Sequence, residues 1–341
     1  MNSSVSTGDS AQVGPGVALS VVIACYNGQE TLPIQLDALL AQDDPVPFEV
    51  ILADNGSTDD SAAIARSYAD RLDLRVVDAS GVKGPGYARN VGVAQARSDR
   101  IAFCDADDEV APTWVRAAYE ALDAHAFVAG KVDIEKLNSE ATRRTRVMAQ
   151  QERLQDSAVG VGFKHAGAGN MAFRRPIFEQ VGGFDESLRC LQDSDLCWRI
   201  QLAGTPLDYV PGLVIFTRLR STASGMVRQG FLYGRSFAHL EGRYGVDPQG
   251  GGQATLEDAA SRRRAQSLTR RLRRVAGLGV GGTLWQVAWH VGHQAGRRDV
   301  RRTPVHIKAS GPSAAPGAAT TPITQESLGG TDAEHHGHSR L

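Results

Sequence analysis

The sequence predicts an α/β fold, with a mostly parallel sheet covered by helices on both faces and a helical extension on its C-terminal side. Short apolar runs alternate with segments of helical periodicity over the first third of the chain. These runs are continuously apolar, as expected for strands that are buried on both faces. The chain has 341 residues, of which 42% are hydrophobic, so it can bury a sizeable core.

Each expected strand coincides with an apolar run, and each expected helix with the segment that follows it. The four strands are expected at residues 17–25, 48–53, 74–79 and 100–104. The helices between them are expected at residues 32–40, 57–68 and 85–97. Ser57 and Thr58 can cap the second helix, and Pro85 suits the first turn of the third.

Beyond Asp133 the alternation weakens. The glycine-rich segment GVGFKHAGAGNMAFRR is expected to be a loop, and helices are expected at residues 193–202 and 225–244. Residues 1–16 and 304–341 are small, polar or rich in Ala, Gly, Ser, Thr and Pro, which predicts disordered tails.

Composition excludes some functions. The formal net charge of −1 gives no global attraction to nucleic acid, and we expect no nucleic-acid partner. The N-terminus lacks the basic start and apolar stretch of a signal peptide, and no apolar window is long enough for a transmembrane helix. The cysteines show no C-x-x-C spacing and predict buried free thiols in a reducing compartment. They are Cys25, Cys104, Cys190 and Cys197.

Chemically useful residues follow the four expected strands, at the edge where such sheets bind ligands. Ala24 and Tyr26 lie at the end of the first strand, and Asp54 lies at the end of the second. Lys83 lies in a glycine turn after the third, with Arg89 on the next helix. With the acids after the fourth strand, this set fits a nucleoside diphosphate and its metal ion.

Asp105 and Asp107 form a D-x-D directly after the fourth strand. One carboxylate can be aimed at a ribose and the other at Mg²⁺ or Mn²⁺, hard cations that share oxygen ligands with phosphates. The alternative is a pair of acids on a helix dipole, because Pro112 and Thr113 begin a helix shortly afterwards.

Asp54 and Arg89 also have structural interpretations. Asp54 can hold a nucleoside, but the Asn-Gly pair after it also favours an Asx turn. Arg89 can reach the diphosphate or form an ion pair with Asp54 or Asp105.

Asp193 and Asp195 stand at the start of an expected helix. Residues two apart do not share a helix face, so one acid can point into a cleft while the other orients or caps the helix. A reaction that deprotonates a hydroxyl group needs one general base, and Asp193 is the candidate. Asp195 is equally well explained as a first-turn acid favoured by the helix dipole.

Three other binding patterns do not fit. A haloacid dehalogenase phosphatase needs Thr or Val two residues after the second acid, where Glu109 stands. A calcium loop would continue with an acid and a glycine, but EVA follows here. A Rossmann dehydrogenase needs G-x-G-x-x-G after its first strand, whereas GPG follows the third, with Arg89 in place of the last glycine.

Six segments resemble family-2 glycosyltransferases in their order and spacing. They are VALSVVIACYNGQETL, VILADNGSTDDS, GPGYARNVGVAQA, IAFCDADD, GNMAFRRPIFEQVGGFDES and QDSDLCWRI. The resemblance extends from Val17 to Tyr244. It implies an inverting enzyme of the GT-A fold that moves a sugar from a nucleotide-sugar donor to a hydroxyl acceptor.

The resemblance implies roles for the matching positions. Asp54 matches the acid that holds the nucleoside base, and Arg89 matches an arginine near the nucleotide. Asp105 and Asp107 match the D-x-D motif, with Asp107 as the ligand of Mg²⁺ or Mn²⁺. Asp193 matches the aspartate proposed as the base.

On the acceptor side, Gly169 and Asn170 match the G-N turn of the family. Two positions depart from the family pattern. Ala24 replaces a frequent proline, at a point where the backbone makes most of the contacts. Gln192 replaces the glutamate that precedes the proposed base.

The predicted organisation is a catalytic domain at residues 17–245, with a nucleotide-sugar half (17–132) and an acceptor half (133–245), followed by a basic helical extension at 246–303. The expected acceptor is a glycan or lipid-linked glycan, as in polysaccharide or cell-envelope glycan biosynthesis. The alternative is a non-catalytic carbohydrate- or nucleotide-binding protein that retains the fold. We expect a cytoplasmic location.

Residues 270–302 are expected to lie on a membrane surface, at its inner face. Eleven arginines and one acid fall between Ser261 and Thr303, and Trp285 and Trp289 are one helical turn apart. The stretch is too short and interrupted to span a bilayer, but its arginines can meet anionic headgroups. The alternative is a helix that packs on the protein and buries both tryptophans.

Overall fold

The computed structural model describes residues 16–145, 149–157, 162–244 and 279–302. The two expected tails, apart from residue 16, and residues 246–278 of the basic extension lie outside these ranges. The domain boundaries therefore stay predictions.

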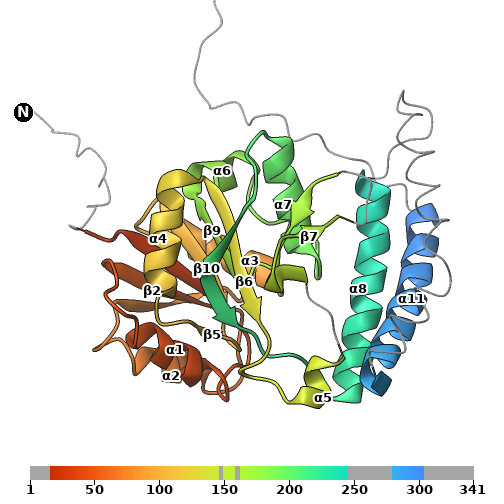
Figure 1. Ribbon diagram of the computed structural model, residues 1–341, viewed down its shortest axis with the longest axis horizontal. Coiled ribbons are helices and arrows are strands. Elements are labelled where there is room, and N and C mark those ends of the chain that lie inside the picture. Colours follow the sequence, from red (N-terminus) through yellow and green to blue (C-terminus); the bar gives the residue numbers. More distant parts are fainter. Residues whose placement is uncertain (1–15, 146–148, 158–161, 245–278, 303–341) are drawn as a thin grey trace, which may run out of the picture. The chain divides into compact units, whose positions relative to one another are not determined.

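Within the described residues, one large sheet forms the centre of the molecule (Figure 1). Its strands are β1 (Leu19–Cys25), β2 (Phe48–Asp54), β3 (Leu74–Asp78), β4 (Arg100–Asp105), β5 (Glu109–Val110), β6 (Phe127–Asp133), β9 (Asn170–Arg174) and β10 (Asp208–Phe216). They lie in the order β3-β2-β1-β4-β9-β6-β10-β5. The first four strands are parallel, whereas β9 runs antiparallel between β4 and β6, and β5 runs antiparallel at the edge. The predicted α/β fold with a mostly parallel sheet is confirmed.

Helices cover both faces of this sheet. They are α1 (Leu32–Leu40), α2 (Ser61–Arg66), α3 (Pro85–Ala94), α4 (Trp114–Ala124), α5 (Glu140–Arg143), α6 (Arg175–Gln180) and α7 (Gln192–Leu202). A short 3₁₀ helix (Ala149–Gln151) and a hairpin of β7 (Gln155–Asp156) and β8 (Lys164–His165) lie before β9.

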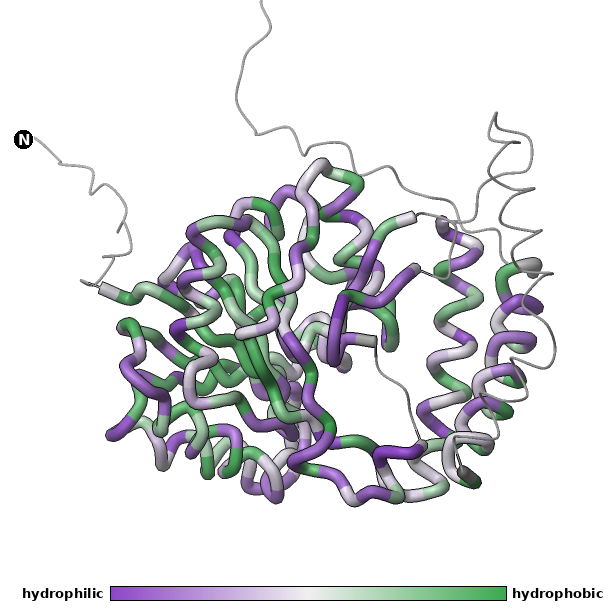
Figure 2. Tube along the Cα trace, in the orientation of Figure 1, coloured by the Kyte–Doolittle hydropathy of each residue, from purple (hydrophilic) through white to green (hydrophobic). Residues whose placement is uncertain are grey.

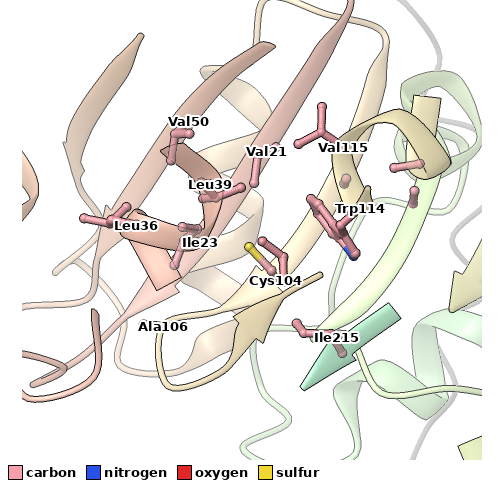
Figure 3. Packing of buried hydrophobic residues seen from close by; sticks show 14 of the residues in the cluster. Val21, Ile23, Leu36, Leu39, Val50, Cys104, Ala106, Trp114, Val115 and Ile215 are labelled. Carbon is pink, nitrogen blue, oxygen red and sulfur yellow. The ribbon is translucent and has the colours of Figure 1, made fainter. Parts of the chain in front are cut away.

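Alternate residues of the buried strands supply two hydrophobic layers. Val21 and Ile23 of β1 pack with residues of α1 and α4, including Trp114 (Figure 3). Val22, on the opposite face, lies in the layer that includes α3, α6 and α7. There α3 comes so close that a Cβ atom on Gly92 would overlap the Val22 side chain. The two layers hold the carboxyl ends of the strands at one edge.

Two expectations about local structure are wrong. The helix after β2 begins at Ser61, and neither Ser57 nor Thr58 caps it. Instead, the Ser57 hydroxyl accepts a hydrogen bond from Asn27 N (3.0 Å), and Thr58 N donates to Asn27 Oδ1 (2.8 Å). These residues therefore fasten the loop after β2 to the loop after β1.

The second correction concerns the glycine-rich segment, which was expected to be a loop throughout. Its last part forms β9, whose first four residues are buried between β4 and β6. Five residues are too few to show a strand period, and the glycines before them resemble a loop. The glycines end where β9 begins, and β8 also lies within the segment, so residues 166–169 between these two strands form a loop.

Two long helices complete the described chain, α8 (Ala223–Tyr244) and α11 (Gly279–Arg302), and they lie side by side (Figure 1). Glycines bring their backbones together. A Cβ atom on Gly230 would lie 2.5 Å from the Trp285 carbonyl oxygen, and one on Gly296 would lie 2.5 Å from that of Arg235. The expected helices at 193–202 and 225–244 are confirmed as α7 and α8. No helix in the described ranges has both the length and the hydropathy needed to cross a bilayer.

Candidate active site

The carboxyl ends of the parallel strands place the predicted residues side by side. Asp54 is paired with Cys25 across β1 and β2, and Ala24 is paired with Asp105 across β1 and β4. Asp54 and Asp105 therefore flank the end of β1, which is followed by Tyr26. This is the edge at which an open α/β sheet binds its ligands.

Three acids gather after β4. Carboxylate oxygens of Asp105, Asp107 and Asp108 all lie within 4.8 Å of one another. The side chains of Asp105 and Asp107 are 34% and 41% exposed, so a ligand can reach them. Asp108 is buried and accepts hydrogen bonds from Arg218 N (2.9 Å) and the Thr217 hydroxyl (3.1 Å). From the sequence, Asp108 was one of the acids after the fourth strand but was given no role of its own.

The cluster is electrostatically strained in the absence of a cation. Burial raises the pKa of Asp107, and the neighbouring Asp105 carboxylate raises it further. Burial, together with the carboxylates of Asp105 and Asp107, raises the pKa of Asp108 well above its ordinary range. Because a shared cation would relieve this repulsion, the three carboxylates fit a hard divalent ion with oxygen ligands.

Arg89 lies beside the acids on α3. Its guanidinium is only 5% exposed and donates from Nη2 to Asp105 Oδ1 at 2.5 Å. It also lies 5.9 Å from the ring centroid of Phe103 and 5.6 Å from that of Phe184. Its Nε and Nη1 atoms are buried without a partner among the described residues. Of the two ion pairs considered for Arg89, the structure contains the one with Asp105.

The side of the edge formed by β2 and β3 carries the predicted nucleoside contacts. Asp54 Oδ1 accepts a hydrogen bond from Ser57 N (3.1 Å), three residues on rather than the two of an Asx turn. Asp54 therefore has a structural role in this loop, but not through the expected Asx turn. Tyr26 is 53% exposed, and Lys83 Nζ lies 5.9 Å from the centroid of its ring. The half-buried Ala24 precedes them on β1.

Asn55, which sequence reasoning treated only as a turn residue, organises the loop that carries Lys83. Its Nδ2 donates to the carbonyl oxygens of Ala79 (2.5 Å) and Val82 (2.8 Å), and its Oδ1 accepts from Gly84 N (2.8 Å). These partners lie 24 to 29 residues away. A local turn motif does not reveal such contacts.

Gly169 lies directly against the acid cluster. A Cβ atom at this position would be 2.5 Å from Asp105 Oδ2 and 3.6 Å from Asp108 Oδ2, so only glycine fits the observed geometry. Asn170 is 1% exposed and its amide donates to carbonyl oxygens of β6 and β10, at 2.9 Å each. Its Oδ1 accepts from Trp114 Nε1 (2.8 Å). Asn170 therefore joins strands, and Gly169 is the member of the predicted turn that meets the site.

Asp193 lies in the first turn of α7, next to the same segment. A Cβ atom on Gly167 would lie 3.9 Å from Asp193 Oδ2, so residues 167–169 contact Asp193 at one end and Asp105 at the other. Burial lowers the pKa of His165, and the Asp193 carboxylate nearby acts in the opposite direction.

Asp195 has a different environment from Asp193. Its side chain is fully buried and accepts hydrogen bonds from Arg199 Nε (2.7 Å), Arg243 Nη1 (2.9 Å) and the Tyr244 hydroxyl (2.6 Å). Arg243 and Tyr244 belong to α8, so Asp195 orients α7 against α8. Gln192, the departure from the family pattern, is also buried and packs near Gly86 at the start of α3.

Comparisons with known proteins show which sequences and folds this chain is similar to. The family model described as glycosyl transferase family 2 matches residues 20–182. The succinoglycan biosynthesis protein ExoO of Rhizobium meliloti is 30% identical over 194 residues, covering 51% of this chain and 53% of its own length. The hyaluronan synthase of Pasteurella multocida is 37% identical over 105 residues, 30% of this chain and 10% of its own. The chain thus spans about half the length of ExoO and a smaller part of the synthase.

Among solved structures, the mannosyltransferase PcManGT from Pyrobaculum calidifontis, in complex with GDP-Man and Mn²⁺, has a similar fold. Its TM-score is 0.54 with 17% sequence identity, over 83% of this chain and 88% of that chain. The expected fold is confirmed as the GT-A type, and the expected family agrees with the match over residues 20–182. Within these residues the chain is similar to glycosyl transferase family 2.

Proposed function

We propose that this protein transfers a hexosyl or related sugar from a nucleotide-sugar donor to a hydroxyl group of a glycan or lipid-linked glycan, with inversion at the anomeric carbon. One observation carries the proposal. The acid cluster and the buried Arg89 share one sheet edge, and Asp193 lies next to the segment that contacts this cluster. Polysaccharide-forming relatives support the acceptor class.

The nucleotide half of the donor is assigned to the strand ends. Tyr26 and Lys83 offer an exposed aromatic face and a cation, and Asp54 offers a carboxylate for the nucleoside. Asp105 is assigned to the ribose, in an orientation that Arg89 fixes. Each assigned side chain lies at the sheet edge and is either exposed or fixed by a hydrogen bond to a neighbouring residue.

Asp107 is assigned as the principal ligand of Mg²⁺ or Mn²⁺, with Asp105 and Asp108 close enough to assist. When bound, the cation would offset negative charge on the departing diphosphate. The unpartnered Nε and Nη1 atoms of Arg89 are two further donors beside the cluster.

The chemistry assigned to Asp193 is that of a general base. It would accept the proton of the acceptor hydroxyl as that oxygen forms a bond to the anomeric carbon. The bond from this carbon to the diphosphate oxygen breaks, and the nucleoside diphosphate leaves with the electron pair. The buried ion pairs of Asp195 support this role because they fix α7 and so limit movement of Asp193.

The substitution Asp107→Asn tests the donor site. It should abolish Mn²⁺-dependent binding of a sugar nucleotide, measured by calorimetry after a thermal-shift screen of several donors, and leave the melting temperature nearly unchanged. Asp44→Asn is the control, because Asp44 is an 89% exposed aspartate whose ion pair is with the surface residue Arg116. Wild-type Mn²⁺-dependent affinity in the Asp107 variant would show that the metal site is elsewhere.

A second function uses the same donor site without transfer, as a carbohydrate- or nucleotide-binding protein that retains the fold. The two are separated by turnover, since only an enzyme releases nucleoside diphosphate from bound donor. The cytoplasmic location and peripheral contact with the inner face of the membrane belong to the same proposal. A separate surface on α8 and α11 supports the proposed membrane contact.

A further inference from the structure

Exposed large hydrophobic residues are concentrated on α8 and α11. Among the described residues, most such side chains belong to these two helices, and we call them the aliphatic face. They are Val227, Leu232, Val280, Leu284, Val287 and Val291. On α11 the spacing places four of them on one side of the helix, at steps of three or four residues. Figure 2 shows hydrophobic and hydrophilic positions alternating along both helices.

The two helices enclose a groove at this face. Its volume is about 650 Å³, and seven hydrophobic side chains line it together with Ser224 and Arg228. Both helices contribute, so the groove depends on their glycine-mediated contact. A contiguous apolar surface of this kind on a protein usually marks an interaction site.

The tryptophans do not form this face, and their packing follows the alternative that the sequence left open, a helix that packs on the protein. Trp289 stacks on His293, with ring centroids 5.0 Å apart, and lies 5.5 Å from the ring of Phe237 on α8. Trp285 lies 6.5 Å from the ring of Tyr233. Both rings therefore pack toward α8, and the aliphatic residues take the outer surface of α11.

Positive charge surrounds the aliphatic face. Together α8 and α11 contain seven arginines and two acids, Glu241 and Asp299. Both acids are paired within the helices: Glu241 Oε2 lies 2.7 Å from His293 Nε2, and Asp299 Oδ2 lies 2.9 Å from Arg235 Nε. Arg228, at the groove, and Arg297 and Arg298 are exposed. The surface thus combines apolar side chains with a net positive charge.

We propose that the aliphatic face docks on an anionic bilayer surface. Apolar side chains bounded by arginines match acyl chains below anionic headgroups. A second copy of the same face would bring two sets of arginines together, and like-charge contact disfavours such a dimer. This inference rests on the membrane contact in the proposed function and assigns it to a surface separate from the donor site.

Docking at this face would hold the catalytic edge near the lipid. Met226 of α8 and Trp285 of α11 line one small cavity with Leu219 and Arg220, in the segment between β10 and α8. Arg220 Nη2 in turn lies 3.9 Å from Asp107 Oδ2. The segment between β10 and α8 thus connects the two docking helices to the acid cluster.

Vesicle co-sedimentation of the full chain tests the proposal. Wild-type protein should bind vesicles of phosphatidylcholine mixed with phosphatidylglycerol, bind phosphatidylcholine alone much more weakly, and be released by salt. The double substitution Val287→Gln and Val291→Gln should weaken binding about tenfold, because both side chains leave the apolar contact. Leu202→Gln is the matched control, since Leu202 and Val287 are each 58% exposed, and it should bind as wild type does.

A second pair of substitutions tests the charge. Arg297→Gln and Arg298→Gln should each weaken binding to the anionic vesicles about fivefold. Thermal melting verifies that every variant is folded, and release of nucleoside diphosphate without vesicles should be unchanged in the valine variant. The proposal is overturned if wild type does not bind anionic vesicles, or if the valine variant binds them equally. A concentration-dependent dimer that the valine substitutions abolish would identify a second copy as the partner instead.

Discussion

Replacing Gly169 with alanine would place a methyl group inside the acid cluster. The new Cβ atom would lie 2.5 Å from Asp105 Oδ2 and 3.0 Å from its Cγ. Ordinary contact needs about 3.4 Å or more, so the carboxylate would have to move by roughly 1 Å. Arg89 holds the other oxygen of Asp105 at 2.5 Å, and this ion pair would be distorted as well.

We expect this substitution to reduce turnover more than it reduces the stability of the fold. A misplacement of about 1 Å at a reacting site costs about 10²-fold in turnover, whereas overpacking costs about 1–3 kcal/mol of stability. Turnover is followed as Mn²⁺-dependent release of nucleoside diphosphate, and donor affinity is measured by calorimetry. Gly212→Ala is the control, because a Cβ atom there meets nothing within 4 Å. If the Gly169 variant stays within twofold of wild type in both measurements, residues 167–169 do not line the site.

Three further predictions follow from the geometry. Asp193→Asn should keep donor affinity and lose about 10²- to 10⁴-fold in turnover, and near-normal turnover would place the base elsewhere. Arg220→Gln should weaken donor binding about fivefold, which is the effect of losing one charge contact at an exposed site. Arg220 lies 3.9 Å from Asp107 and is 66% exposed. Unchanged donor affinity would show that Arg220 is not part of the donor site. Glu49→Gln should lower the free energy of unfolding at pH 7 by about 2–3 kcal/mol, against less than about 0.5 kcal/mol for Asp44→Asn. Burial alone would raise the pKa of Glu49, but a serine hydroxyl, a backbone amide and two guanidinium groups outweigh it and lower the pKa. The stabilisation by Glu49 is therefore complete at a pH above 4.5, the ordinary pKa of a glutamate, and is lost as the pH falls through the lowered pKa. Acid unfolding curves that coincide for wild type and Glu49→Gln would contradict this.

The fold was predictable because continuous apolar runs mark strands that are buried on both faces. The carboxyl ends of β1, β2 and β4 agree with the expected carboxyl ends to within one residue. Because the polar residues that follow these strands must meet at one edge, their neighbourhood was predictable as well. Asp54, Asp105 and Asp107 illustrate this, since each follows directly from a strand end.

Contacts between distant segments were not predictable in the same way. Asp108 is held by groups that are 109 and 110 residues away, and Trp114 donates to Asn170 across 56 residues. A single sequence carries no signal for such pairs, so Asn170 resembled an acceptor contact although its amide joins strands. The two interpretations of the tryptophans of α11 stayed open for a related reason. Helical periodicity shows which residues share a side of a helix, but the partner helix decides which side is covered.

The buried charges around α7 connect the candidate base to the helix that forms the membrane-docking face. Asp195 is fully buried and its bonds to Arg243 and Tyr244 tie α7 to the end of α8. Arg243 also pairs with Asp185 at 2.7 Å. One guanidinium group therefore binds an acid that precedes α7 and an acid in the first turn of α7. Breaking a buried pair costs several kcal/mol, which makes independent movement of α7 and α8 unfavourable. Because the same α8 carries Val227 and Leu232 of the aliphatic face, the base and the docking surface are fixed to one rigid element. An acceptor anchored in the bilayer would then approach Asp193 from a direction that α8 determines.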